Sequence, residues 1–219
     1  LYTVNYPLPE PLFDKSSRIF PTYNMAIPDQ FRADVFMDEF KEKWSENNLP
    51  SVITLMLPND HGTRERVEAG YPYQESYMAD NDLALGRTIE FLSRTPYWKN
   101  MAVFVTEDDP QGGVDHVDAH RSIMMMASPY AKKNYNGHYH YSFGSIFKTF
   151  WNILGIPYLN QYDATATDMR DLFTDKPDFT PYNAVAPDLR IFDPQKALTP
   201  FDENFDWKAF SESEELDKT

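Results

Sequence analysis

The chain has 219 residues, of which 42% are hydrophobic and 25% charged, so it carries enough apolar side chains for one sizeable folded core. Its 34 acidic and 20 basic side chains give a formal net charge of −14, which opposes binding in a nucleic-acid groove. The chain has no cysteine, which excludes disulfides, thiolate metal ligands and a cysteine nucleophile, and no apolar run in it is long enough for a transmembrane segment.

The first elements expected along the chain are an extended arm, a helix and a strand. Residues 1–28 contain five prolines, which predicts an extended segment laid across a larger body. Residues 29–47 carry apolar side chains mostly at helical spacing, among them Phe36 and Phe40, which predicts a helix. Residues 51–57 (SVITLML) form a short apolar run, which is typical of a parallel strand covered on both faces.

Strand and helix patterns continue to alternate beyond this point. Helices are predicted at residues 77–94, 145–154 and 164–173, and strands at residues 101–106 (MAVFVT) and 122–127 (SIMMMA). This order predicts an α/β fold with a largely parallel sheet flanked by helices. We expect one structural unit over residues 1–219, with its core at about residues 29–175 and extended arms at residues 1–28 and 176–219.

A first polar cluster follows the strand predicted at residues 51–57. Asn59, Asp60 and His61 supply oxygen and imidazole groups, and Gly62 permits a tight backbone path around a ligand. A turn in which Asn59 and Asp60 bond to their own backbone is the alternative, and for this segment alone we favour it. His138 and His140 are likewise assigned to a polar loop, and Asp80 to the amino end of the helix predicted at residues 77–94.

A second polar cluster follows the strand predicted at residues 101–106. Three consecutive acids, Glu107, Asp108 and Asp109, precede Asp115, His116, Asp118 and His120. Such a group would repel itself without a cation, so we expect it to bind a divalent metal. Turn capping by an aspartate, or orientation of His120 by Asp118, is the structural alternative.

Three longer stretches carry a family resemblance. These are LPNDHG (residues 57–62), MADNDLALGRTIEFLSRTPYWKNMAVFVTEDD (residues 78–109) and DHVDAHRS (residues 115–122). Together they resemble the phosphoesterase family of the alkaline phosphatase superfamily, which includes acid phosphatases and phospholipase C-like enzymes. These stretches are most similar in sequence to a bacterial branch in which this domain follows a β-propeller. The chain resembles the carboxyl-terminal portion of that domain.

The resemblance implies an alkaline phosphatase-like sheet and a metal site that activates a hydroxyl nucleophile. It implies metal ligation by Asp60, Asp108, Asp109 and His120, with zinc expected first and manganese, iron or calcium as alternatives. His61 or His116 would protonate the leaving group. Superfamily members often carry a metal-binding histidine four residues after the aspartate, but Arg64 stands there in this chain, which puts two full metal sites in doubt.

The resemblance also implies that the nucleophilic Ser or Thr lies in an upstream part of the same polypeptide. We therefore expect a metal-dependent phosphoesterase that acts on phosphate esters and is secreted or periplasmic, and whose activity as this fragment is not assured. The alternative is a non-catalytic interaction domain in which a structural cation stabilises the acidic cluster.

Overall fold

The computed structural model describes residues 9–45, 48–108, 110 and 120–199. The chain divides into two compact units, which are described separately. We call Leu1–Leu92 with Tyr182–Thr219 the helical unit, and Ser93–Pro181 the hairpin unit. The expectation of a single structural unit stays a prediction.

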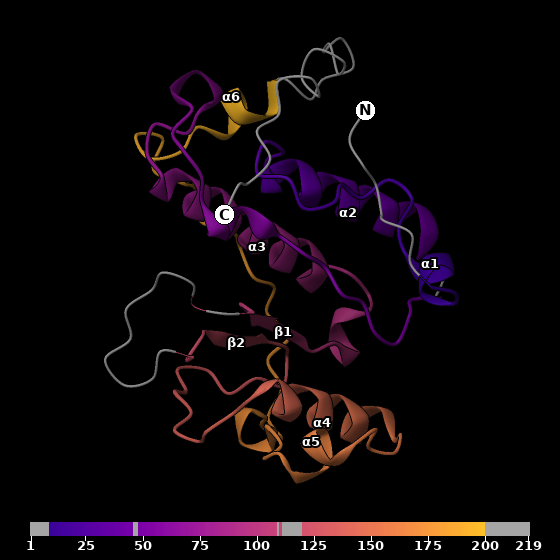
Figure 1. Ribbon diagram of the computed structural model, residues 1–219. Coiled ribbons are helices and arrows are strands. Elements are labelled where there is room, and N and C mark those ends of the chain that lie inside the picture. The colour runs from indigo at the N-terminus through magenta and orange to yellow at the C-terminus, as the bar shows by residue number, and fades with distance from the viewer. Residues whose placement is uncertain (1–8, 46–47, 109, 111–119, 200–219) are drawn as a thin grey trace. The chain divides into compact units, whose positions relative to one another are not determined.

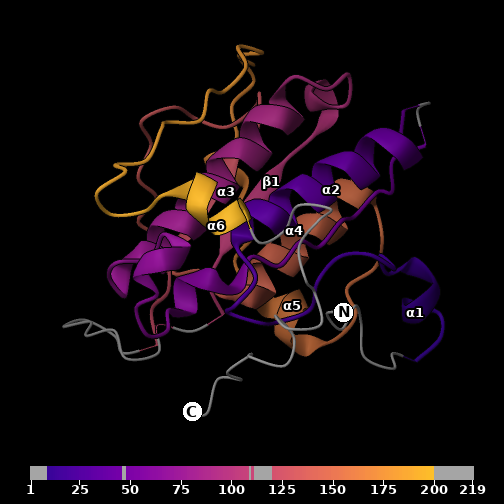
Figure 2. The same ribbon diagram turned by 90° about the horizontal axis from the view of Figure 1, so that it is seen from above.

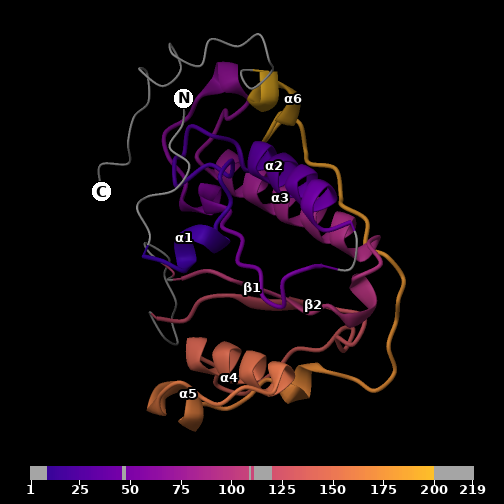
Figure 3. The ribbon, with the colours of Figure 1, turned by 90° about the vertical axis from the view of Figure 1, so that its right-hand side faces the viewer.

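The helical unit is built around two long helices, α2 (Asp29–Lys43) and α3 (Glu75–Ser93), which lie side by side (Figures 1 and 3). Their bounds confirm the helices predicted at residues 29–47 and 77–94. Aromatic rings join them, since Phe40 of α2 meets Phe91 of α3 edge to face at 5.3 Å between ring centroids. The short elements of this unit are α1 (Leu12–Lys15), η1 (Pro58–His61), η2 (Val67–Ala69) and α6 (Pro194–Leu198).

A second apolar cluster joins α6 to α3 (Figure 2). Tyr71 and Tyr77 stack with their ring centroids 4.2 Å apart, and Phe192 meets Tyr71 at 5.1 Å. Met25 and Ala197 complete this cluster of buried side chains. Met25 belongs to the segment expected to be an extended arm at residues 1–28, and Phe192 and Ala197 to the arm expected at residues 176–219. Both arms therefore supply core residues, which the sequence analysis did not anticipate.

Gly70 lies where the segment after η2 approaches the start of α6. Its φ is +88°, and a Cβ at this position would lie 2.5 Å from the carbonyl oxygen of Asp193. The same close approach is held by a hydrogen bond of 3.1 Å from the Asp193 N–H to the Gly70 carbonyl. A side chain at this position would therefore force the start of α6 away from Gly70.

The strand predicted at residues 51–57 is wrong, because this segment has no strand pairing. Its side chains are substantially exposed, with Val52 at 48% and Met56 at 42% of full exposure. A strand requires a neighbour that accepts and donates backbone hydrogen bonds, and none of the described residues supplies one for this segment. The apolar, branched composition is that of a strand, but the described part of the chain holds no strand that pairs with it.

The hairpin unit holds β1 (Val103–Thr106) and β2 (Met124–Ala127), which confirm the strands predicted at residues 101–106 and 122–127. They pair antiparallel, with Val103 opposite Ala127 and Thr106 opposite Met124. The expectation of a largely parallel sheet is therefore not met by the described strands. What the described residues form is a mixture of helices with a small two-stranded antiparallel sheet.

Helix α4 (Phe143–Leu154) lies along this hairpin (Figures 1 and 3) and confirms the helix predicted at residues 145–154. The Ser142 and Ser145 side chains form a reciprocal capping box at its start. Phe104 of β1 meets Phe150 of α4 at 5.2 Å between ring centroids. The single helix predicted at residues 164–173 is wrong, since α5 (Gln161–Thr165) and η4 (Arg170–Leu172) stand there as separate short elements, and η3 (Trp98–Asn100) precedes β1.

None of the helices in the described part of the chain has the length and apolar character needed to cross a membrane.

Candidate functional site

The first predicted site residues, Asp60 and His61, lie on the short helix η1 of the helical unit. Pro58 occupies the first turn, where its fixed φ suits a helix and its missing N–H is not needed. The Gly62 N–H closes the turn on the Asn59 carbonyl at 3.1 Å, and Gly62 has a φ of +70°. The tight path expected at this glycine is therefore confirmed, and it sets Asp60 and His61 half-buried at the end of the turn.

Asn59 anchors this turn in the interior, where its side chain is fully buried. Its backbone N–H donates to Asp29 Oδ2 at 2.9 Å, and its side-chain Nδ2 donates to Asp80 Oδ2 at 2.6 Å. Asn81 adds a bond from its Nδ2 to the Leu57 carbonyl at 2.7 Å. The turn that carries Asp60 and His61 is thus tied to both long helices by buried hydrogen bonds.

Asp80 is the centre of this network, and its side chain is fully buried in the amino-terminal third of α3. Its carboxylate accepts hydrogen bonds from the Asp29 N–H at 2.9 Å, the Gln30 N–H at 3.1 Å, Gln30 Nε2 at 2.9 Å, Asn59 Nδ2 at 2.6 Å and the Tyr71 hydroxyl at 2.8 Å. The first two donors are orphan N–H groups of the first turn of α2. Asp80 lies near the amino end of α3, as expected, but its carboxylate caps α2 and not its own helix.

A buried guanidinium accompanies the two carboxylates. Arg32 donates to Asp29 Oδ1 at 3.1 Å and to the carbonyls of Ile27, Thr22 and Asn24. Burial lowers the pKa of Arg32, with Asp29 opposing that shift. Burial raises the pKa of Asp29 to about 7, Arg32 counteracts this, and the nearby charge of Asp80 raises it further. The buried Arg32 guanidinium thus forms an ion pair with Asp29 and also interacts electrostatically with Asp80.

Two features of this turn bear on ligand binding. Asn59 Oδ1 is buried and has no hydrogen-bond partner among the described residues. Buried polar atoms are usually satisfied by a protein group, a water or an ion, so this oxygen is an available acceptor. The His61 ring stands edge-on to Tyr23, 6.0 Å between centroids, and its Nδ1 lies 3.4 Å from the Gly62 carbonyl oxygen.

The hairpin unit holds two further predicted ligands, Asp108 and His120. Asp108 lies two residues after the end of β1, and His120 lies four residues before the start of β2. Because the register pairs Thr106 with Met124, the end of β1 and the start of β2 lie at the same end of the hairpin. Asp108 and His120 are both exposed there. The antiparallel pairing thus brings together, at one end, segments that the sequence analysis placed in one polar cluster.

Asp109 and His116 lie outside the described residues, as do Asp115 and Asp118. Within the part of the chain that the structure describes, no three His, Asp or Glu side chains lie close enough together to hold a metal ion. The ligand set of Asp60, Asp108, Asp109 and His120 therefore stays a prediction. Its chemistry, hard carboxylate oxygen with imidazole nitrogen, fits zinc or manganese.

Sequence reasoning missed one carboxylate with an unusual set of partners. Asp171 accepts a hydrogen bond of 2.9 Å from the Tyr135 hydroxyl and another from the Tyr141 hydroxyl. Burial, followed by the bond to Asp171, raises the pKa of Tyr141. These bonds fix the loop that carries His138 and His140, which are exposed. Alternating tyrosines in this loop were visible in the sequence, but nothing pointed to Asp171 as their partner.

Comparison with known proteins gives one result that bears on the whole site. The model of the phosphoesterase family matches residues 3–157, which is more than two thirds of the chain. No curated protein matches the chain. All six predicted site residues lie inside the matched range, and the match indicates hydrolysis of phosphate esters.

Proposed function

Because this chain belongs to the phosphoesterase family, we propose that it hydrolyses phosphate esters at a metal centre. The observation that carries the proposal is the family match, since it spans both polar clusters, from Asn59 to His61 and from Glu107 to His120. Asp60, Asp108, Asp109 and His120 would hold the metal, and zinc suits this mixture of donors. When bound, the cation would act as a Lewis acid on the phosphoryl oxygen.

The buried network around Asp80 supports a positional role for Asp60 and His61. Catalytic groups act efficiently only when the structure holds them in a fixed geometry before the substrate arrives. Here the turn is fixed from within by Asn59, while Asp60 and His61 remain half-buried at its end. The unpartnered Asn59 Oδ1 adds a further oxygen acceptor to the same turn. His61 or His116 would donate a proton to the leaving oxygen.

We further propose that the nucleophile is a hydroxyl in an upstream segment of the same polypeptide. Two features of the described residues support additional sheet structure from outside them. Residues 51–57 are rich in apolar side chains that are mostly exposed, and they pair with no described strand; Ile123 and Met125, beside and within β2, are 48% and 49% exposed. Such surfaces on a native chain are usually covered by a neighbouring element. We propose that this element belongs to the upstream segment and that the polypeptide is a secreted or periplasmic bacterial protein, which the family resemblance supports.

The test is hydrolysis of an aryl phosphate by a polypeptide that includes the upstream segment, with added zinc or manganese. The variants are Asp108→Asn and His120→Ala, with Asp82→Asn as the matched control because Asp82 is an exposed acid on α3. We expect each site variant to lower the rate by at least about 100-fold, since it removes a ligand, and the control to retain the rate. Equal rates in all variants would overturn the assignment, and absence of any hydrolysis would favour a non-catalytic interaction domain.

A further inference from the structure

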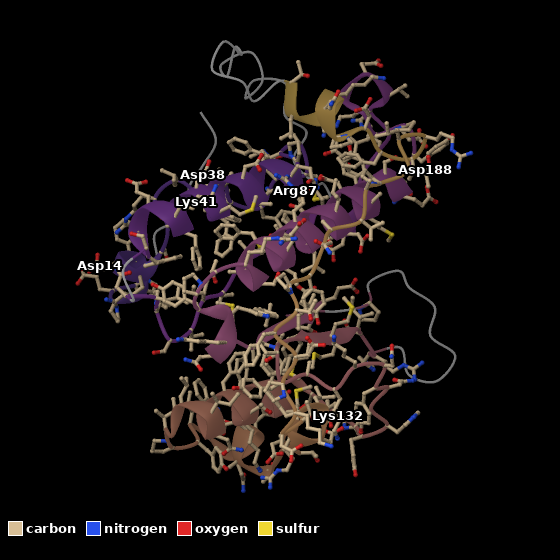
Figure 4. The ribbon with its side chains drawn as sticks, turned by 180° about the vertical axis from the view of Figure 1, so that it is seen from behind. Asp14, Asp38, Lys41, Arg87, Lys132 and Asp188 are labelled. Atoms are coloured by element: carbon tan, nitrogen blue, oxygen red, sulfur yellow. The ribbon has the colours of Figure 1, made fainter. Side chains whose placement is uncertain are left out.

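A hollow in the hairpin unit concentrates positive charge on an otherwise acidic protein. It has a volume of about 400 Å³, and its lining includes Lys132, Lys133 and Lys176 with Asp178 as the one acid. The chain as a whole has a formal net charge of −14. Figure 4 shows Lys132, which belongs to the loop after β2. The volume lies within the range of about 300–1,000 Å³ that small-molecule sites occupy.

The hollow is formed by residues 131–135 and by a second segment, residues 174–178. Backbone hydrogen bonds hold these two segments together. The Lys132 N–H donates to the Leu172 carbonyl at 2.9 Å, and the Thr174 N–H donates to the Tyr130 carbonyl at 2.8 Å. The Asp178 N–H donates to the Pro129 carbonyl at 2.8 Å. These hydrogen bonds fix the backbone positions from which the lysines that line the hollow extend.

Only one of the three ammonium groups is neutralised by a carboxylate of the described residues. Lys133 forms an ion pair with Asp178, whose pKa its hydrogen bond holds well below the usual range. The Lys132 ammonium lies 4.8 Å from the centroid of the Tyr135 ring, which attracts a cation but leaves its charge in place. The Lys176 side chain has neither an ion pair nor a hydrogen bond with any residue in the described ranges. Two positive charges are left for an anion.

The backbone adds neutral donors at the same place. Asn134 adopts the left-handed region with a φ of 53°, within the turn between Lys133 and Tyr135. The N–H groups of these three residues make no hydrogen bond to any residue that the structure describes. Successive free N–H groups in a turn form a concave site that suits an oxyanion.

We propose that this hollow binds a phosphate-type oxyanion carried by a small soluble molecule, between Lys132 and Lys176. Tetrahedral oxyanions offer several acceptor oxygens, which match two ammonium groups and a row of N–H donors. The net charge of −14 opposes an anionic membrane surface or a nucleic-acid backbone, which favours a small ligand. The proposal does not depend on the proposed hydrolysis, because none of the residues in the predicted metal site takes part.

The test is a titration of the full chain with inorganic phosphate in the presence of EDTA. Binding is monitored through the backbone amide signals in NMR spectra. The chelator excludes phosphate bound through a metal. We expect saturable shifts at the amides of residues 132–135 and 174–176. In the double variant Lys132→Gln, Lys176→Gln we expect affinity to fall at least about tenfold, because two charge-assisted contacts are lost.

The matched control is Lys41→Gln, Lys99→Gln, which removes the same charge from two exposed lysines outside the hollow. It should retain the affinity of the unchanged chain. An equal loss in both double variants would show a general charge effect and overturn the proposal. Unchanged affinity in the Lys132→Gln, Lys176→Gln variant, or shifts that never saturate, would also overturn it.

Discussion

The two units bury aspartate side chains with opposite electrostatic results. In the helical unit, Asp29 and Asp80 are fully buried beside one guanidinium, and the pKa of Asp29 rises. In the hairpin unit, Asp163 is only 2% exposed, yet its pKa falls. Desolvation raises the pKa of Asp163, but donors from Leu159, Asn160 and Trp151 outweigh it. Burial is the largest single influence on both pKa values, and it prevails at Asp29, whereas the hydrogen-bond donors around Asp163 together outweigh it.

The first prediction concerns Asp80, whose removal should have the largest effect. Asp80→Ala leaves the first-turn N–H groups of α2, the Asn59 amide and the Tyr71 hydroxyl without their acceptor in the interior. We expect the free energy of unfolding to fall by about 3–5 kcal/mol, as for other broken buried charge networks. Chemical denaturation would measure this. Asp82→Ala, on the exposed face of α3, should change stability by less than about 0.5 kcal/mol, and a similar loss in both variants would contradict the network.

The second prediction is the equivalent change in the hairpin unit. Asp163 accepts hydrogen bonds from the Leu159 N–H at 3.0 Å, the Asn160 N–H at 3.0 Å and Trp151 Nε1 at 2.7 Å. Asp163→Ala should lower the free energy of unfolding by about 1–3 kcal/mol, because these donors lose their acceptor but no buried cation is left unpaired. Asp175→Ala, at an exposed position, is the control. A loss larger than that of Asp80→Ala would break the comparison between the units.

The third prediction is a pH dependence of opposite sign in the two units. Because the pKa of folded Asp29 is raised from 3.8 to about 7, the native state holds more protons between these values. The free energy of unfolding should therefore fall as the pH rises from about 4 to about 7, by at most about 1.4 kcal/mol per pH unit. Asp29→Asn should flatten this slope in denaturation curves recorded at several pH values.

Asp163 provides the contrast, since its pKa is lowered by folding. Its contribution is present above the unfolded pKa and is lost as the pH falls below about 4. Asp163→Asn should reduce the loss of stability in acid while leaving the slope between about pH 4 and 7 intact. The same slope change in both variants would contradict the assignment of opposite signs.

The smallest predicted effect concerns a partly exposed contact between α2 and α3 in the helical unit. Arg87 of α3, between the two helices in Figure 4, donates to Asp34 of α2 and to Gln30 Oε1 at 2.9 Å. Its side chain is 30% exposed, so Arg87→Ala should cost about 0.5–1 kcal/mol, measured by thermal unfolding. Lys41→Ala, which removes an exposed pair with Asp38, should cost less. If Arg87→Ala lowered the free energy of unfolding by more than Asp163→Ala does, the ranking of these interactions would be contradicted.

The sequence predicted those elements that carry a clear periodic or apolar pattern of their own. Helices α2, α3 and α4 follow apolar periodicity, and β1 and β2 follow apolar runs that pair with each other. Residues 51–57 have the same composition but no pairing strand among the described residues, and a strand cannot be recognised from one side of a pair. The antiparallel direction of the hairpin also escaped prediction, because short apolar runs carry no record of their partner's direction.

The site was predicted in residue type more than in organisation. The polar clusters around Asp60 and Asp108 were visible because both follow apolar runs. The role of Asp80 was missed, because its partners Asp29 and Gln30 lie about 50 residues away in sequence. One signal was present: α2 begins after Pro28, whose side chain offers no acceptor, so its first N–H groups require a cap from elsewhere.

The proposed metal ligands are Asp60, Asp108, Asp109 and His120, and the metal content of the purified chain tests this proposal most directly. Elemental analysis after incubation with zinc and gel filtration should find bound metal in the unchanged chain and in Asp82→Asn. Asp60→Asn and Asp108→Asn should each lower the bound fraction, with circular dichroism confirming that the variants fold. Equal metal content in all four proteins would contradict the account.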